Sequence, residues 1–439
     1  MFYIVERQDQ LDKLHIGEQM FIQVIPVNDN YHPKLQSISL IYVRDLNLHK
    51  GYILCVNHSE SFSLEISAIV DKLSFCTKLY TLDKKALIHQ LSTLDPQCIY
   101  DISIYNNLYH IQDISISEYE SKVEISFKRK YYNTDYNCLI PISKHYEKWE
   151  NTYDHIENLI NSITFNYKPY EFMNHYGPLL FSYIEAQGIK LNKELFIKHY
   201  SSLPNLKFSI SKGKIYTQYN INTTTCRPSN AFNGINFAAL NKNTGERETF
   251  VAENDRLIEI DFSAYHPNII SRLVGYEYDK NYNFYEQLSQ HFPLATPDTI
   301  KESVFQQLYG GIRKEYQDQP FFKQVYEYSM NNWKRFNYGE QISINEIGKS
   351  FNKDIIDNPT PQKLLNYLVQ NSETLLNIVQ FNGVMNILKG KNTKIILYTY
   401  DSILIDYDDT ENLLDDIKSQ LLFNTSVKSG INYNEMEKL

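Results

Sequence analysis

Three stretches of the sequence decide the fold: IDFSAYHPNIISRL (260–273), KESVFQQLYG (301–310) and YTYDSILID (398–406). The first stretch is predicted to be an apolar strand that ends at Asp261 and continues as a helix after Pro267. The third is predicted to be a hairpin of two apolar strands that turns near Asp401. Each aspartate therefore lies at the end of an apolar strand, where burial of a lone carboxylate is costly unless it is paired, protonated or bound to metal.

Two such strands side by side would form an oxygen-rich pocket of the kind that hard divalent cations such as Mg²⁺ prefer. Taken singly, each aspartate is explained as well by a polar strand end. The middle stretch belongs to a helix predicted over 299–310, which places Lys301, Phe305 and Tyr309 on one face. A cation one turn from an aromatic ring suits a nucleoside triphosphate. An amphipathic helix with a solvated lysine explains the same spacing.

Composition and charge limit the class of protein. The chain has 439 residues, 14% aromatic residues and a formal net charge of −9, which excludes a disordered or low-complexity protein. The acidic balance argues mildly against a nucleic-acid partner, but basic residues cluster locally, so net charge decides little. No apolar run reaches the roughly 18–20 residues of a membrane helix, and the N-terminus lacks a secretory signal pattern. Five widely spaced cysteines without a CxxC pair fit a reducing compartment. We therefore expect a cytoplasmic protein without a membrane partner.

The rest of the chain predicts an α/β organisation. Residues 37–66 are predicted to form three short strands, and Asp83 occupies the N-cap position of a predicted helix. Further elements are expected as helices over 67–73, 84–94, 150–164 and 178–189, and as strands over 98–102 and 212–222.

In series, the motifs resemble the polymerase domain of family A DNA polymerases. The segment 260–273 resembles motif A, 301–310 resembles motif B, and 398–406 resembles motif C. Four looser matches follow the same order: PLLFSYIEAQGIKLN (178–192), TTTCRPSN with FNGIN (223–236), LLNYLVQNSET (364–374) and GINYNEM (430–436). Together they cover about residues 175–439, and their order is far more specific than any single match.

The resemblance implies a right-hand palm and fingers that carry out templated nucleotidyl transfer with two Mg²⁺ ions. Asp261 and Asp401 would hold both ions, with the backbone carbonyl of Phe262 as a further ligand. Lys301 would bind the triphosphate of the incoming dNTP, while Phe305 and Tyr309 would pack on base and template. The family's contacts to primer-template DNA would fall on Arg227, Asn233, Asn236, Asn366, Gln370 and Tyr400.

Several positions depart from the family pattern. His266 replaces the glutamate that shields the sugar 2′ position, so His266 or its neighbour Tyr265 is expected to reject a 2′-hydroxyl. Ser402 stands where motif C normally has a second acid, and single-subunit RNA polymerases share this serine. Pro297 replaces an arginine that precedes the motif B lysine, and Cys226 replaces the glycine of the family's T-x-T-G-R motif.

The same resemblance predicts the domain organisation. We expect an N-terminal extension (1–35), a degenerate RNase H-like 3′–5′ exonuclease-type domain (36–135), a connector (136–170) and the polymerase domain (171–439). The strands predicted over 37–43 and 51–57 carry no acid, so the exonuclease-type domain is expected to be inactive. Only about fifteen residues separate KELF from KGKIYTQYN, so the thumb near 190–212 is expected to be rudimentary. Weak processivity, or a partner that supplies a clamp, would follow.

The leading hypothesis is therefore a template-directed DNA polymerase, a nucleotidyltransferase without proofreading from a phage or other mobile element. A second hypothesis keeps the fold but makes the product RNA, because Ser402 replaces an acid and the gate glutamate is absent. A third is a catalytically silent nucleic-acid-binding replication protein.

Overall fold

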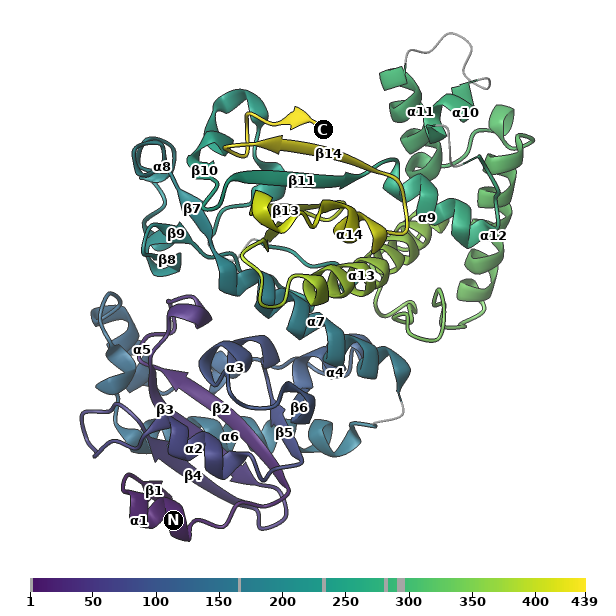
Figure 1. Ribbon diagram of the computed structural model, residues 1–439. Helices are drawn as coiled ribbons and strands as arrows, with labels where there is room; N and C mark the ends of the chain where they lie inside the picture. The colour runs from purple at the N-terminus through teal and green to yellow at the C-terminus, as the bar shows by residue number, and fades with distance from the viewer. Residues whose placement is uncertain (1–2, 165–166, 231–233, 280–282, 290–296) are drawn as a thin grey trace. The chain divides into compact units, whose positions relative to one another are not determined.

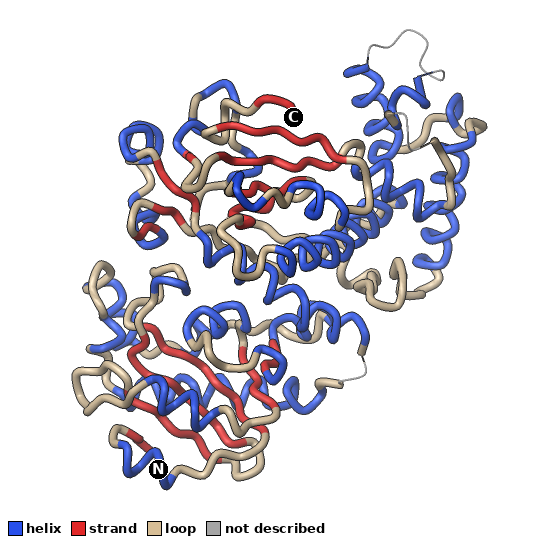
Figure 2. The backbone as a smooth tube through the Cα atoms, in the orientation of Figure 1, coloured by secondary structure: helices blue, strands red, loops and turns tan. Residues whose placement is uncertain are grey.

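The computed structural model describes residues 3–164, 167–230, 234–279, 283–289 and 297–439, and it is a mixed α/β structure, as expected. The chain divides into two compact units. Unit 1 contains residues 1–188 and 202–218, and unit 2 contains residues 189–201 and 219–439. Figure 1 labels the elements of both units, and Figure 2 colours them by type. No helix in the described ranges is long and apolar enough to span a membrane.

Unit 1 is built on a six-stranded mixed sheet of order β1-β4-β3-β2-β5-β6. β2 lies antiparallel to β3 and parallel to β5, while β3 and β4 are antiparallel and β5 and β6 parallel. The strands are β1 (Tyr3–Val5), β2 (Gln19–Pro26), β3 (Ile38–Asp45), β4 (Lys50–Cys55), β5 (Lys78–Thr81) and β6 (Ile99–Asp101), with a short hairpin of β8 (Ile210–Ser211) and β9 (Lys214–Ile215). The helices are α1 (Gln8–Lys13), α2 (Ile66–Leu73), α3 (Lys84–Gln90), α4 (Ile102–Tyr109), α5 (Lys122–Lys130), α6 (Ile142–Ser162) and α7 (Lys168–Gln187).

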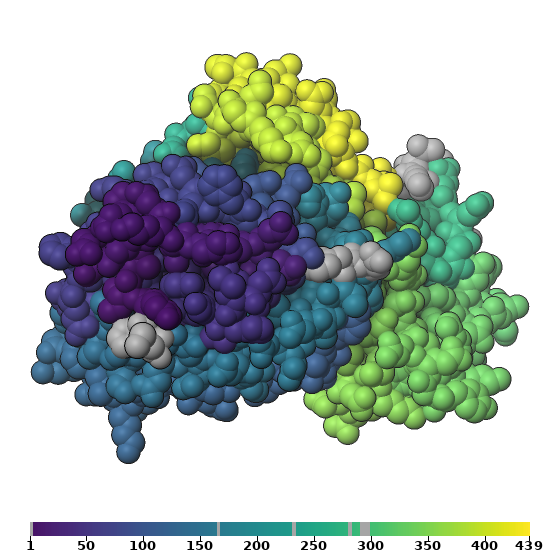
Figure 3. Space-filling model, turned by 90° about the horizontal axis from the view of Figure 1, so that it is seen from below, coloured from purple at the N-terminus to yellow at the C-terminus, as the bar shows by residue number. Residues whose placement is uncertain are grey.

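The sheet of unit 1 begins earlier in the chain than the sequence patterns indicated. β1 and β2 both belong to it, so residues 1–35, expected to form an extension, contribute strands to the sheet. β1 and α1, purple in Figure 3, lie at the surface of unit 1. β2 has buried apolar residues on both faces because the sheet is covered on both sides, and Met20, Phe21 and Ile22 are all fully buried.

Two of the expected strands differ in the structure. Residues 60–65 form no strand but a loop that leads into α2. Leu64 is buried there while Phe62 is 69% exposed, so the alternating pattern reflects one anchoring side chain rather than a sheet edge. In the interval 212–222, only Lys214 and Ile215 are in a strand. The expected helix cap is present, because Asp83 Oδ1 accepts a hydrogen bond from the Ala86 N–H at 2.9 Å.

Unit 2 is built on a five-stranded antiparallel sheet of order β12-β13-β11-β14-β15. The long helix α13 contacts α9, α11 and α12, which gather beyond the strand ends in Figure 1. The strands are β7 (Ile189–Leu191), β10 (Phe250–Val251), β11 (Arg256–Phe262), β12 (Lys394–Tyr398), β13 (Ser402–Tyr407), β14 (Thr425–Gly430) and β15 (Glu437–Lys438). The helices are α8 (Lys193–Tyr200), α9 (Tyr265–Val274), α10 (Phe284–Leu288), α11 (Pro297–Gly310), α12 (Pro320–Asn337), α13 (Pro361–Ile387) and α14 (Leu414–Ser419).

Unit 1 is held together in part by a buried ion pair between two of its helices. Glu185 of α7 is fully buried and receives contacts from the Lys85 ammonium at 2.6 Å and the His89 ring at 3.0 Å. Burial alone would raise the pKa of the Glu185 carboxyl. Lys85 and His89 outweigh burial and lower this pKa to about 2.

We predict that Glu185→Leu lowers the free energy of unfolding by about 3–5 kcal/mol at pH 7, because it leaves the Lys85 ammonium buried without its counter-charge. Since the pKa of Glu185 is depressed, its contribution is complete above about pH 4.5 and is lost as the pH falls toward 2. Urea unfolding at pH 7 and at pH 3 measures both effects. The exposed pair Lys144–Glu147 supplies the control, because Glu147→Gln should change stability by less than about 0.5 kcal/mol. Equal effects of the two substitutions would contradict this prediction.

Candidate active site

Asp261 and Asp401 are brought together by the pairing of β11 with β13. The antiparallel register places Asp261 opposite Ser402, and the Phe262 N–H donates to the Asp401 carbonyl oxygen at 2.9 Å. Leu257, Ile258 and Ile260 of β11 are buried, so the strand is anchored by its apolar residues up to the aspartate. The two predicted carboxylates, distant in sequence, are thus neighbours at one end of the sheet.

The turn that presents Asp401 has a constrained backbone. Tyr400 adopts a left-handed conformation with a φ of 63°, which is uncommon for a residue other than glycine. The Asn377 side chain of α13 stabilises the turn by donating to the Tyr400 carbonyl oxygen at 2.7 Å. Thr399 and Ser402 close it through a backbone hydrogen bond of 2.9 Å and a contact of 2.6 Å between their hydroxyls. Ser402 therefore closes the turn instead of contributing an acid.

Nearby negative charges and desolvation raise the pKa values of both carboxylates. Burial, followed by the charges of Asp401 and Glu259, raises the pKa of the Asp261 carboxyl to about 6. Desolvation by the surrounding protein also raises the pKa of Asp401, and the charge of Glu373 adds to this. A divalent cation between the carboxylates would relieve this repulsion.

The donor set fits Mg²⁺ better than a structural metal. The described part of the chain contains no group of three or more His, Cys, Asp or Glu side chains placed to hold an ion. Asp261 and Asp401 are the two carboxylates that could contribute oxygen ligands at this place. Mg²⁺ is commonly bound by one or two carboxylates, with substrate phosphates and waters completing the octahedron.

Helix α11, whose sequence resembles motif B, lies near Asp261. The exposed Lys301 is close enough for its charge to act on Asp261, whose pKa it lowers slightly against the dominant effects. The rings of Phe305 and Tyr309 are 5.8 Å apart, so the predicted face of the helix exists. The Tyr309 hydroxyl lies 2.5 Å from His266 Nδ1 and joins α11 to the start of α9.

Tyr265 and His266, the two expected guards of the sugar, occupy different environments. Tyr265 is 4% exposed, stacks on Phe262 with ring centroids 4.3 Å apart and donates its hydroxyl hydrogen to Asn377 Oδ1 at 2.5 Å. His266 retains 17% exposure of its side chain and contacts Tyr309. Of the two side chains, His266 is the one placed to meet a ligand.

Glu373 of α13 completes this region and was not predicted from the sequence. It is fully buried, 3.0 Å from Arg227 Nε and 3.1 Å from His266 Nε2. The Arg227 guanidinium also lies over the Tyr400 ring, 3.9 Å from its centroid. One buried carboxylate therefore orients the candidate sugar guard, and its arginine partner packs on the turn that carries Asp401. The sequence signal that could have pointed to Glu373 was a charged residue among the apolar residues of a long helix.

The remaining residues that were predicted to contact DNA lie in different places. Gln370 accepts from the Thr225 hydroxyl at 3.0 Å and donates to Asn366 at 3.2 Å, so Asn366 and Gln370 form one polar group with Thr225, which is close to Arg227 in sequence. Asn236 is exposed before a short 3₁₀ helix (Phe237–Ala239). Asn233 lies outside the described residues.

Comparison with known proteins gives a likeness of fold. No protein-family model matches the sequence, and no curated protein matches it. Among solved structures, the chain is similar to the polymerase domain of Pol1 from M. smegmatis in complex with DNA primer-template and dNTP, with a TM-score of 0.67. The match covers 99% of both chains at 12% sequence identity. The chain therefore has the fold of a Pol I polymerase domain, as the order of motifs indicated.

The raised pKa of Asp261 predicts a cost in stability. Because its folded-state pKa of about 6 exceeds its ordinary value, the charged carboxylate destabilises the fold increasingly as the pH rises from about 4 to 6. Without divalent metal at pH 7.5, Asp261→Asn should therefore stabilise the protein by roughly 1–2 kcal/mol. Thermal unfolding in EDTA should show this gain at pH 7.5 and lose it near pH 4. A destabilising effect of Asp261→Asn at pH 7.5 would contradict it.

Proposed function

We propose that the protein is a template-directed DNA polymerase that adds dNTPs to a primer 3′ end by two-metal nucleotidyl transfer. The observation that carries the proposal is the placement of Asp261 and Asp401 close together at one end of an antiparallel sheet, with Asp261 within reach of the charge of Lys301. The shared fold with a polymerase domain that was solved with primer-template DNA and dNTP supports it. In this proposal the chain is a divergent relative of family A, of phage or mobile-element origin.

The residues of the site have different proposed tasks. Asp261, Asp401 and the Phe262 carbonyl would hold two Mg²⁺ ions, which when bound would supply charge neutralisation at the triphosphate and lower the pKa of the primer hydroxyl. Lys301 binds the triphosphate as a point charge. Phe305 and Tyr309 support the base, and His266 contacts the sugar. Arg227, Asn236, Asn366, Gln370 and Tyr400 face the primer-template.

Unit 1 supports a polymerase without proofreading. Its sheet order and strand directions are compatible with an RNase H-like exonuclease-type domain, but its central strand β2 contains no acidic residue. Asp83 and Asp101 are instead used as helix caps, and Asp101 accepts hydrogen bonds from the Lys84 and Ile104 N–H groups at 2.8 and 3.0 Å. Carboxylates committed to backbone donors are poor candidates for a metal pair.

We expect Asp261→Ala or Asp401→Ala to reduce extension of a primed DNA template with Mg²⁺ and dNTPs by more than about 10³-fold. DNA binding, measured by fluorescence anisotropy, should not weaken, because the aspartates repel phosphate. Asp409→Ala is the matched control, since this exposed acid pairs with Arg256 at the opposite end of β11. Unchanged extension by both palm variants would favour the silent nucleic-acid-binding protein and would refute the proposal.

His266 is expected to determine the choice of sugar. His266→Ala should lower the ratio of dNTP to rNTP incorporation about tenfold or more, because an open space replaces the ring that meets the 2′ position. His266→Gln, which keeps a polar side chain of similar length toward Tyr309 and Glu373, should lower it less. Single-nucleotide incorporation with each class measures the ratio. A wild-type preference for rNTPs would instead identify an RNA-synthesising enzyme of the same fold.

A further inference from the structure

Glu373 is a fully buried carboxylate on the long helix α13, and two side chains from distant segments share it. Arg227 Nη2 donates to Glu373 Oε1 at 3.1 Å. Glu373 Oε2 lies 3.0 Å from Arg227 Nε and 3.1 Å from His266 Nε2, so one oxygen faces both partners. Arg227 Nε is buried, yet it makes no hydrogen bond in the part of the chain that the structure describes. Arg227 therefore lacks the two parallel hydrogen bonds of an ideal arginine–carboxylate pair.

The His266 ring is held at both of its nitrogens. A carboxylate only accepts hydrogen bonds, so Nε2 carries the hydrogen that points to Glu373. Burial raises the pKa of the Tyr309 phenol, so its hydroxyl stays protonated and donates to His266 Nδ1 at 2.5 Å. A neutral imidazole has one donor and one acceptor, and these two contacts use both. Glu373 and Tyr309 therefore fix the tautomer and the orientation of the ring that the proposed function assigns to the sugar.

Arg227 is held less completely than His266. Its side chain is 24% exposed, and its guanidinium lies over the Tyr400 ring, 3.9 Å from the centroid. If Arg227 contacts DNA, the acceptors of the DNA compete with Glu373 for the same donors. Separation of a buried carboxylate from its counter-charge is costly, so DNA and Glu373 oppose each other at Arg227. Once Arg227 has turned away, His266 is the remaining hydrogen-bond partner of Glu373 among the described residues.

The other ionisable groups around Glu373 do not replace Arg227. Burial and the charge of Glu373 raise the pKa values of three phenols, which therefore stay neutral at pH 7: Tyr265, Tyr309 and Tyr398. The charge of Glu373 also raises the pKa of Asp401, which as an acid cannot balance it. Among the described residues, Arg227 is thus the permanent cation within ion-pair distance of Glu373.

We propose that Glu373 is a positioning residue that couples DNA binding to the selection of the sugar. In the free protein, Arg227 and His266 share its carboxylate. Primer-template DNA draws Arg227 away, and the whole carboxylate then orients His266, so the sugar guard is held most firmly when DNA is bound. This coupling rests on the proposed function, which assigns Arg227 to DNA and His266 to the sugar.

The first measurement is the affinity for primer-template DNA, by fluorescence anisotropy without nucleotide, so it does not depend on catalysis. Glu373→Leu removes the competing carboxylate and should tighten binding by about three- to tenfold. Arg227→Gln should weaken binding. In the Arg227→Gln background, Glu373→Leu should bring no such gain, because the side chain that the carboxylate restrains is absent. Simple loss of a structural contact would instead weaken binding in both backgrounds.

The second measurement is the ratio of dNTP to rNTP incorporation at a single template position. Glu373→Leu should lower this ratio about threefold or more, through faster rNTP incorporation, with the kcat for dNTP kept within about threefold of the parent. Glu373→Gln, whose Oε1 can still accept from His266, should lower the ratio less. Arg227→Gln should keep the ratio of the parent, because it leaves Glu373 to His266. Tighter DNA binding together with weaker sugar selection is the signature of a shared carboxylate.

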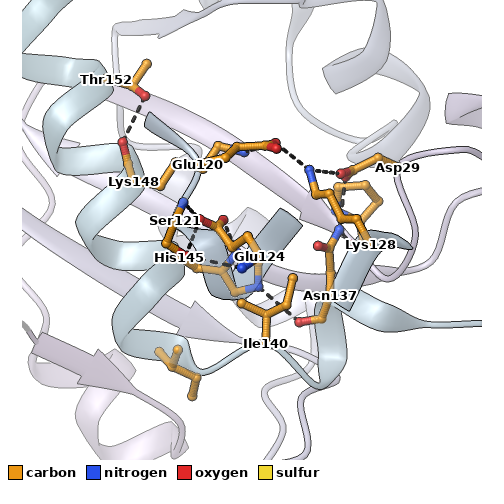
Figure 4. Close-up of polar contacts among 12 residues, drawn as sticks. Asp29, Glu120, Ser121, Glu124, Lys128, Asn137, Ile140, His145, Lys148 and Thr152 are labelled. Carbon is orange, nitrogen blue, oxygen red and sulfur yellow. Dashed lines mark hydrogen bonds and ion pairs between the residues drawn. The ribbon is translucent and has the colours of Figure 1, made fainter. Parts of the chain in front are cut away.

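Unit 1 supplies a matched control in Glu120, a half-buried carboxylate that is also shared by two cations. Figure 4 shows its contact with Lys128, whose Nζ lies 2.5 Å from Glu120 Oε1, and Lys148 Nζ lies 3.0 Å from the same oxygen. Glu120→Gln removes one negative charge from a similar network outside unit 2, so it should change neither the DNA affinity nor the sugar ratio. Circular dichroism checks the folding of every variant, and if Glu373→Leu unfolds, Glu373→Gln takes its place in both measurements.

Weaker or unchanged DNA binding in the folded Glu373 variant would overturn the proposal, as would an equal gain in the Arg227→Gln background. A sugar ratio equal to that of the parent in both Glu373 variants would also overturn it. If the parent incorporates no nucleotide at all, the proposed function fails, and the affinity measurements still decide whether Glu373 restrains Arg227.

Discussion

The antiparallel pairing of β11 with β13 is the constraint on which the candidate active site depends. It fixes two carboxylates beside each other at the end of an apolar sheet, where burial and like charge raise both of their pKa values. This arrangement lowers the stability of the fold, so stability alone does not explain it. The sheet supplies the rigidity that keeps the pair together, and the Asn377 contact to the Tyr400 carbonyl orders the turn that carries the second acid.

A third carboxylate, the buried Glu373, organises the surroundings of Asp261 and Asp401. In the family that the motifs resemble, a glutamate lies five residues after the first aspartate, where this chain has His266. Here Glu373 approaches from α13 and contacts both His266 and Arg227. Glu373 thus places a carboxylate beside His266 from a different element, and His266 Nδ1 lies 2.5 Å from the Tyr309 hydroxyl. His266 and Glu373 are in direct contact and therefore act as one unit.

Local patterns predicted the site strands well and the long-range partners poorly. The apolar runs before Asp261 and Asp401, and the helix that carries Lys301, are visible in sequence because strand and helix periodicity are properties of neighbouring residues. Glu373 could not be assigned, because its partners come from two distant segments. β2 was missed, although it is apolar, because the strand prediction began with the later run that forms β3. The segment 60–65 was wrongly predicted to be a strand, because its alternating pattern reflects a single buried leucine.

The central claim is that Asp261 and Asp401 bind metal as one unit. Binding of Mn²⁺ measured by electron paramagnetic resonance, in the presence of primed DNA with a dideoxy-terminated primer and the next dNTP, tests it most directly. The account predicts that Asp261→Ala, Asp401→Ala and the double variant lose the protein-bound signal to the same extent, because either carboxylate alone cannot complete the site. Retention of the wild-type signal in either single variant would contradict the account.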